Sequence, residues 1–388
     1  MRHIEIPLSS PDIDDEDRRV VNEVMQGRSL SIGPWVERFE GRLAEASGRA
    51  HAVAVSSGTS ALHLIVRALE WGPGDEIITT PFSFVASANC LLYEHARPVF
   101  VDIDPTTRCI DPAAIERAIT SRTVGILSVD VFGYPANWAA LEDIAARHSL
   151  TLVSDSCESL GTIREADGRR IPAGKSGIAG AFAFYPNKQI TTGEGGAVVT
   201  DDERIAGLCR SMRNQGRDPG AGWLQHARLG YNYRLSEINS ALGYSQLGRL
   251  EEIKQRRNVV AARYLELLEP LREWLDAPPT ASAVDLSWFV FVVSLKEQFS
   301  GKDRDDILEG LRARGIGCSN YFSPIHLQPY IQDRLQTARG DFPVTEHIAD
   351  RTIALPFFTS LAAADQEVVI RELTAQLQRS AAGHTTRP

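Results

Sequence analysis

The stretch from 181 to 196 reads AFAFYPNKQITTGEGG and sets a single lysine, Lys188, in a tight loop between two apolar segments. From residue 52 onward, short β-branched runs alternate with longer helical stretches, which is typical of an α/β domain with a mainly parallel sheet. Strands are expected at 52–55, 76–79, 99–102, 124–129, 151–154, 181–184 and 197–200. Between them, apolar residues at a spacing of about 3.6 predict helices at 60–70, 84–93, 112–119 and 138–148.

The second half of the chain predicts a smaller unit. Apolar residues at helical spacing from 235 to 268 indicate a long helical bridge out of the first domain. Beyond Pro278 and Pro279 the pattern gives a strand at 288–294 and a capped helix from Asp303 to Arg314. We therefore expect a large domain over 1–250 that includes the N-terminal segment, a smaller C-terminal α+β domain over 251–379, and a disordered tail over 380–388.

Composition excludes several classes of protein. The formal net charge is −9, from 50 acidic and 41 basic residues, which argues against a nucleic-acid partner. The five cysteines are scattered without a C-x-x-C pair or histidines at ligand spacing, so no disulfide framework and no metal site is predicted. The sequence has no run of eighteen apolar residues and no signal-peptide pattern, so we expect a cytoplasmic protein without a membrane partner.

Lys188 is an unusual lysine because it lies between apolar segments and a glycine-rich turn. Desolvation at such a position favours covalent chemistry with a carbonyl group over a salt bridge. The alternative is a surface lysine in a hairpin loop, which would be the better interpretation if the loop stood alone.

Two further features follow strands. Asp155 ends the run TLVSD at 151–155, and open α/β sheets bind ligands at the carboxyl ends of their strands. A carboxylate there could keep the ring nitrogen of a cofactor protonated, but a plain turn aspartate is the alternative. The run SSGTS at 56–60 opens a helix, where Gly58 permits close approach of an anion and Thr59 adds a hydroxyl. Simple helix capping is the commoner use of such residues.

Seven motifs occur in order along nearly the whole chain. They are SSGTSALHL (56–64), GPGDEIITTPFSFVASAN (72–89), PVFVDIDP (98–105), SDSCESLGT (154–162), FYPNKQITTGEGGAVVTD (184–201), LGYNYRLSEINSALG (229–243) and SPIHLQPY (323–330). Together they resemble the DegT/DnrJ/EryC1/StrS aminotransferases. The resemblance implies the aspartate-aminotransferase fold (PLP fold type I), a homodimer with shared active sites, and sugar transamination with pyridoxal 5'-phosphate (PLP).

The resemblance also implies roles for single residues. Lys188 would form the covalent link to PLP and carry the proton between cofactor and sugar carbon, and Asp155 would pair with the pyridine nitrogen. Glu158 stands where the family places a side chain near the ring oxygen. Phe84 would pack on the pyridine face, a role that its flat apolar ring suits, with core packing as the alternative.

Phosphate and substrate contacts follow in the same way. Gly58 and Thr59 match the phosphate-binding turn, and Asn232 matches an asparagine that reaches the phosphate from the neighbouring subunit. His326 resembles a histidine near the substrate, although a lone histidine is more often structural. Many relatives have a serine phosphate ligand where this chain has Ala183, so one hydroxyl donor is missing.

The resemblance implies a ping-pong transaminase. L-Glutamate is the expected amino donor, and a nucleotide-diphosphate-linked keto-deoxysugar is the expected acceptor. The TTGEGG run after the lysine favours a 4-keto sugar, with a 3-keto sugar or a keto-cyclitol as alternatives. A PLP-dependent sugar dehydratase is a rival, but known dehydratase relatives replace the lysine with histidine. A non-catalytic regulator of the same fold is a second rival, and it would have no need of Lys188.

Overall fold

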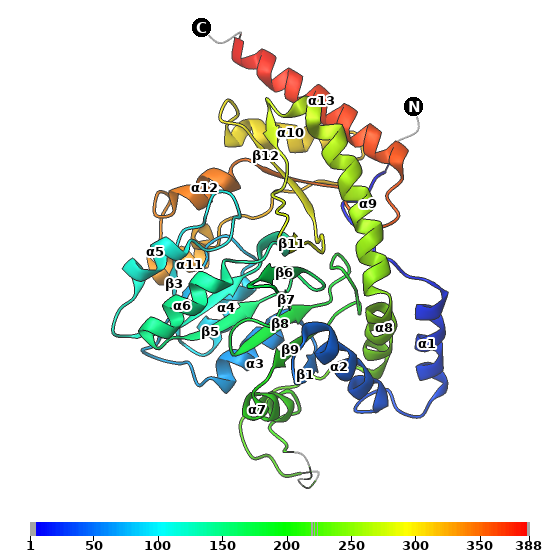
Figure 1. The fold of residues 1–388 in the computed structure, drawn as a ribbon, viewed down its shortest axis with the longest axis vertical. Helices are drawn as coiled ribbons and strands as arrows, with labels where there is room; N and C mark the ends of the chain where they lie inside the picture. Colours follow the sequence, from blue (N-terminus) through cyan, green and yellow to red (C-terminus); the bar gives the residue numbers. More distant parts are fainter. Residues whose placement is uncertain (1–4, 219, 221, 223, 386–388) are drawn as a thin grey trace.

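The protein has a large unit around an extended sheet and a smaller unit, joined by the long helix α9 (Leu250–Leu268) (Figure 1). The computed structural model describes residues 5–218, 220, 222 and 224–385, with side chains described through 382. The predicted boundary at residue 250 falls at the junction of α8 (Glu237–Gly248) with α9. No helix in the described ranges is long and apolar enough to cross a bilayer.

The large sheet has seven strands in the order β1-β9-β8-β5-β4-β2-β3. Their bounds along the chain are β1 His51–Val55, β2 Glu76–Thr79, β3 Arg97–Phe100, β4 Thr123–Val129, β5 Thr151–Asp155, β8 Ala179–Ala183 and β9 Gly196–Thr200. Only β9 runs antiparallel to its neighbours, β1 and β8. The predicted α/β class with a mainly parallel sheet is confirmed. β3 starts two residues earlier than expected. The reason is that it pairs with β2 residue by residue, from Arg97 opposite Glu76 to Phe100 opposite Thr79.

Helices cover both faces of this sheet, so its strands are apolar on both sides. Val53 and Val55 of β1 join a core with helices α3 (Gly58–Ala68), α4 (Ala86–Tyr93), α6 (Trp138–His148) and α7 (Glu203–Arg213). The alternate residues Ala52 and Ala54 join a second core with α2 (Pro34–Ser47) and α8. This double burial explains why most of the strands could be recognised as short apolar runs.

Several elements were not expected from the sequence. The helices among them are α1 Asp15–Gln26, α2, α7, α11 Pro329–Leu335, α12 Pro343–Ala349 and α13 Ala363–Thr385. The strands among them are β6 Ile163–Ala166, β7 Arg169–Pro172, β10 Leu275–Asp276, β11 Val284–Asp285 and β13 Thr352–Leu355. The expected helix at 112–119 is shorter, with α5 at Pro112–Ile115 followed by one 3₁₀ turn at Glu116–Ala118. Most of the missed strands are too short to show a period in the sequence.

The smaller unit has a three-stranded sheet, β10-β12-β13, with β12 at Phe291–Leu295, and helices α10 (Gly301–Arg312) and α13. Ile6, near the N-terminus, packs against this unit. It is buried in the core of the unit, donates its N–H to Gly315 O at 2.9 Å and accepts from Gly317 N at 2.8 Å. The division into domains at residue 250 stays a prediction.

The structure describes a helix over the first part of the predicted disordered tail. Helix α13 continues to Thr385, and residues 386–388 lie outside the described part of the chain. The helix continues because its last described turns have partners: Leu377 is fully buried, and Ser380 Oγ donates to Asp303 Oδ1 at 2.8 Å.

Candidate active site

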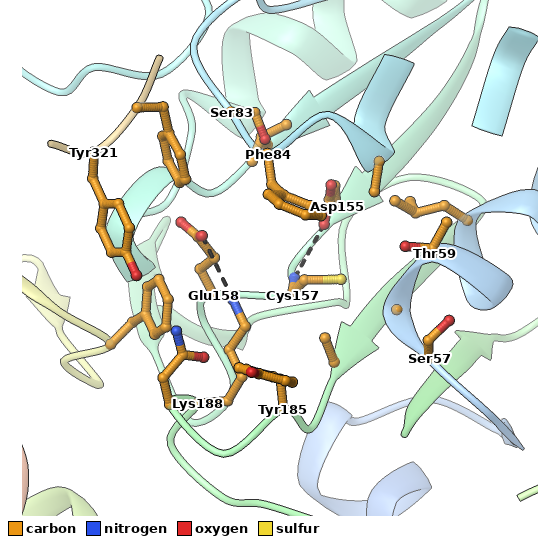
Figure 2. A pocket seen from close by; sticks show the side chains of 18 of the residues that line it. Ser57, Thr59, Ser83, Phe84, Asp155, Cys157, Glu158, Tyr185, Lys188 and Tyr321 are labelled. Atoms are coloured by element: carbon orange, nitrogen blue, oxygen red, sulfur yellow. Dashed lines mark hydrogen bonds and ion pairs between the residues drawn. The ribbon is translucent and has the colours of Figure 1, made fainter. Parts of the chain in front are cut away.

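A cavity of about 620 Å³ lies at the carboxyl edge of the parallel strands. Val129, Asp155 and Ala183, the last residues of β4, β5 and β8, all line it. The first turn of α3 forms a second part of the wall, and segments near residues 289 and 321 complete it. The cavity therefore lies where the sheet, a helix N-terminus and the smaller unit meet (Figure 2).

Lys188 reaches into this cavity from the loop between β8 and β9. Its side chain is only 12% exposed, so it is not a surface lysine of a hairpin. Its Nζ lies 3.6 Å from Glu158 Oε1 and 3.8 Å from the centroid of the Phe289 ring. The amine is thus held between a carboxylate and an aromatic face, and a salt bridge is present that the sequence did not lead us to expect.

Glu158 is the buried carboxyl group next to this amine. Its Oε2 accepts a hydrogen bond from the backbone N–H of Phe132 at 2.8 Å, which leaves Oε1 facing Lys188. Burial raises the pKa of Glu158 above its usual value, and the charge of Lys188 offsets part of that rise. One oxygen is therefore fixed to the main chain while the other faces the lysine.

Asp155 lies at the floor of the cavity and is 5% exposed. Its Oδ2 accepts from Ser87 Oγ at 2.7 Å, and its Oδ1 accepts from Cys157 N at 3.2 Å. The second bond is typical of a turn in which an aspartate side chain accepts from the backbone N–H two residues later. The Asp155 side chain therefore forms this turn and also lines the cavity.

The first turn of α3 combines a helix cap with free donors. Ser57 is the N-cap, and its Oγ accepts from Ser60 N at 3.0 Å. Within the described residues, the backbone N–H groups of Gly58 and Thr59 have no hydrogen-bond partner. Both residues line the cavity, and Thr59 lies on the side opposite Tyr321 (Figure 2). The turn is therefore suited to an anion.

Gly58 is needed for packing as well. A Cβ at this position would lie 2.7 Å from the Cβ of Ala183 and 2.9 Å from the Sγ of Cys157. Ala183 is thus the residue that faces the turn from β8, and it offers no hydroxyl there.

Phe84 presents its ring to the cavity and is 62% exposed. Phe82, two residues before it, is fully buried and packs against Phe132 and Phe322. Phe82 therefore packs in the core, whereas Phe84 does not and is exposed to the cavity.

Two residues predicted for the site do not line this cavity. Asn232 is exposed and forms an isolated bridge with Asn214. His326 is fully buried, and its Nε2 lies 3.0 Å from Glu346 Oε1. Its surroundings correspond to the structural alternative for that histidine.

Several side chains that line the cavity were missed. They are Tyr185, Asn187, Phe289, Asn320 and Tyr321. The first two flank Lys188 in the sequence and could have been proposed from that position alone. The other three come from the smaller unit, and no local pattern places them near the lysine.

The chain is similar to known proteins over nearly its whole length. The model of the DegT/DnrJ/EryC1/StrS aminotransferase family matches residues 11–374. The spore coat polysaccharide biosynthesis protein SpsC of Bacillus subtilis (strain 168) is 34% identical over 375 residues, which cover 94% of this chain and 95% of SpsC.

Solved structures show the same similarity. Helicobacter pylori PseC, an aminotransferase involved in the biosynthesis of pseudoaminic acid, matches with a TM-score of 0.91 and 31% identity over 97% of this chain and 100% of its own. Spr1654 of Streptococcus pneumoniae in its PLP form matches with a TM-score of 0.91 and 25% identity, again over 97% and 100% of the two chains. Spr1654 is also known in a pyridoxamine phosphate form. The fold is that of the fold type I aminotransferases.

Proposed function

The chain belongs to the DegT/DnrJ/EryC1/StrS aminotransferase family of PLP-dependent sugar aminotransferases, and on this basis we propose that it transfers the amino group of L-glutamate to a nucleotide-diphosphate-linked keto-deoxysugar. The preferred acceptor in this proposal is a 4-keto sugar, with a 3-keto sugar or a keto-cyclitol as the alternatives. The observation that carries the proposal is the cavity in which Lys188, Asp155 and the α3 turn converge.

The residues of the cavity suit PLP. The cofactor needs an anion site, an amine, a carboxylate and a flat apolar contact. The unpartnered N–H groups of Gly58 and Thr59 suit the phosphate, and Lys188 offers the amine. Asp155 offers the carboxylate, and the exposed ring of Phe84 offers the contact.

The proposed mechanism follows from these positions. When bound, PLP supplies a carbonyl carbon that accepts amines and a ring that withdraws electrons. Lys188 Nζ would hold the cofactor, and its amine would take and return a proton at the substrate carbon that loses or gains the amino group. Asp155, whose Oδ2 accepts from Ser87, would offer its carboxylate to the ring nitrogen. Glu158 faces Lys188 at 3.6 Å and orients its amine between proton transfers.

A substrate panel tests the proposal. The PLP-loaded enzyme is incubated with L-glutamate and nucleotide-linked 4-keto sugars, 3-keto sugars and keto-cyclitols, and both 2-oxoglutarate and product mass are measured. We expect 2-oxoglutarate in equal amount to an aminated 4-keto sugar. A product that has lost a hydroxyl without gaining an amine would support the dehydratase instead, and no product from any acceptor would refute the proposal.

We further propose that the active site is shared between two subunits. Asn232 is exposed and lies outside the cavity of its own chain, as a residue that serves a neighbouring subunit must. Asn232 lies between Tyr231 and Tyr233 in the sequence. The rings of these two tyrosines stack with their centroids 4.9 Å apart. Tyrosine is a residue type that is enriched in interfaces.

Hybrid dimers test this arrangement. A mixture of Lys188→Ala and Asn232→Asp subunits should regain activity, because each hybrid has one site with both defects and one site with neither. Asn232→Asp places a carboxylate against the cofactor phosphate, so its homodimer should bind PLP poorly. Recovery near half of the wild-type activity per hybrid is expected. A fully active monomer, or hybrids without recovery from two defective parents, would refute the shared site.

A further inference from the structure

Arg257, in the first half of α9, contacts the main chain of the lysine loop. Its guanidinium group is buried and donates to three backbone carbonyls. Nη2 donates to Lys188 O at 3.0 Å, and Nη1 donates to Trp288 O at 3.3 Å and Phe289 O at 3.2 Å. One side chain of the long helix thus joins the lysine loop to the segment that precedes β12.

This arrangement is costly for the folded protein. In the part of the chain that the structure describes, no carboxylate forms an ion pair with Arg257, and its Nε has no partner. Burial lowers the pKa of Arg257 to about 10. Burying a charge without an ion-pair partner is unfavourable, but the rigid fork of an arginine presents donors on separate nitrogen atoms and so reaches three separated carbonyls, whereas the three donors of a lysine share one nitrogen.

Two of the three carbonyls belong to Lys188 and Phe289, the residues that contact each other at the amine. Lys188 carries Nζ, and Phe289 carries the ring that lies 3.8 Å beneath Nζ. Because the same guanidinium binds the main chain of both residues, it sets the position of the amine relative to the ring. Gln189 adds a second link, since its Nε2 donates to Glu158 O at 2.6 Å and Ser287 O at 3.0 Å.

We propose that Arg257 is a positioning residue for Lys188, acting through the main chain of Lys188 and Phe289 to hold the amine over the cavity. The proposal rests on the proposed function, in which Lys188 holds the cofactor and moves the proton. It assigns to α9 a part in catalysis in addition to its part in joining the two units.

The neighbouring Arg256 provides a matched control. Its side chain is 42% exposed, and its Nη1 lies 2.8 Å from Asp12 Oδ2, away from the lysine loop. Arg257→Lys and Arg256→Lys are therefore the same chemical change at adjacent positions of one helix.

The experiment measures PLP loading, kcat, KM, and the visible circular dichroism per bound cofactor, which reports how firmly the cofactor is oriented. Arg257→Lys keeps the charge but cannot bind all three carbonyls. We expect loading and KM close to wild type, a lower visible circular dichroism, and a kcat about 100-fold lower, the cost of misplacing a catalytic group by about 1 Å. Arg256→Lys should keep wild-type values. A wild-type kcat together with wild-type visible circular dichroism in Arg257→Lys would overturn the proposal.

A second variant keeps the test decisive if Arg257→Lys does not fold. Arg257→Gln buries no charge and has only two N–H donors on one nitrogen, so it cannot replace the contacts of both Nη1 and Nη2, and it should also lower the visible circular dichroism and kcat. Wild-type values in Arg257→Gln would refute the proposed link between Arg257 and the amine.

Borohydride fixation separates this proposal from the proposed function. In wild-type protein, PLP should become attached to Lys188, as read from the mass of its peptide. Absence of that attachment refutes the proposed function, and the role of Arg257 with it. Attachment in wild type together with an unaffected Arg257→Lys refutes only the role of Arg257.

Discussion

Lys188–Glu158 and His326–Glu346 are both pairs of a buried basic group and a carboxylate, but only the first pair lines the cavity. Lys188 Nζ lies 3.6 Å from Glu158 Oε1, and both side chains face the open volume. His326 Nε2 lies 3.0 Å from Glu346 Oε1, but His326 packs edge-on against Phe342. Both basic residues belong to motifs that resemble the family. Burial and pairing therefore do not mark a catalytic group unless a ligand can also reach it.

The largest effect is expected from Lys188→Ala. The change removes both the attachment point of the cofactor and the proton carrier, and loss of acid–base catalysis alone typically costs about 100-fold to 10,000-fold in rate. Turnover with glutamate and the accepted sugar, together with borohydride fixation of PLP, measures the loss. Near-normal transamination by Lys188→Ala would mean that the Lys188–Glu158 pair is no more catalytic than the His326–Glu346 pair.

Asp155→Asn should give the next largest loss. The amide keeps the shape and can still accept from Ser87, but it removes the carboxylate that we propose faces the ring nitrogen. We expect kcat to fall about 100-fold, the size typical of losing one preorganised electrostatic contact. PLP affinity should change much less than kcat. An unchanged rate and cofactor spectrum would mean that Asp155 serves only the turn to Cys157.

The comparison also shows what the sequence can and cannot predict. Lys188, Asp155 and the Gly58–Thr59 turn are recognisable because each lies next to a strand end, where local pattern and topology agree. Phe289 and Tyr321 reach the same cavity from the smaller unit, more than 100 residues further along the chain. Their position depends on how the two units pack, which no local periodicity encodes. The contact of Ile6 with the smaller unit depends on the same packing.

Replacing each carboxylate by its amide sharpens the contrast between the pairs. Glu158→Gln should lower kcat about tenfold, or about 1.4 kcal/mol, because it removes the carboxylate of the ion pair that faces Lys188 Nζ. Its stability should be retained, because burial already raises the pKa of Glu158 and a neutral amide is easier to bury.

Glu346→Gln should lower the stability of the fold and leave turnover nearly unchanged. Glu346 accepts from His326 and from the backbone N–H of Gly340, so the variant should lose about 1–3 kcal/mol in the free energy of unfolding with little change in kcat. Urea unfolding and steady-state kinetics on both amide variants check the pair. A large loss of kcat in Glu346→Gln with unchanged stability would place the second pair in catalysis.

The smallest effect concerns the pH dependence of His326. Burial lowers the pKa of His326 from its usual 6.5, although Glu346 partly offsets the shift. The unfolded chain therefore binds more protons at this residue than the folded chain does, and stability rises with pH in that range. The contribution of His326 is complete above pH 6.5 and decreases as the pH falls toward the lowered value. His326→Gln has no such proton, so between pH 7.5 and 5.5 it should lose less stability than wild type, by about 1 kcal/mol. Urea unfolding at the two pH values measures this difference, and kcat at pH 7.5 should stay within about threefold of wild type because His326 does not line the cavity. Equal pH dependence in both proteins, combined with a strong loss of kcat, would instead assign His326 to the substrate.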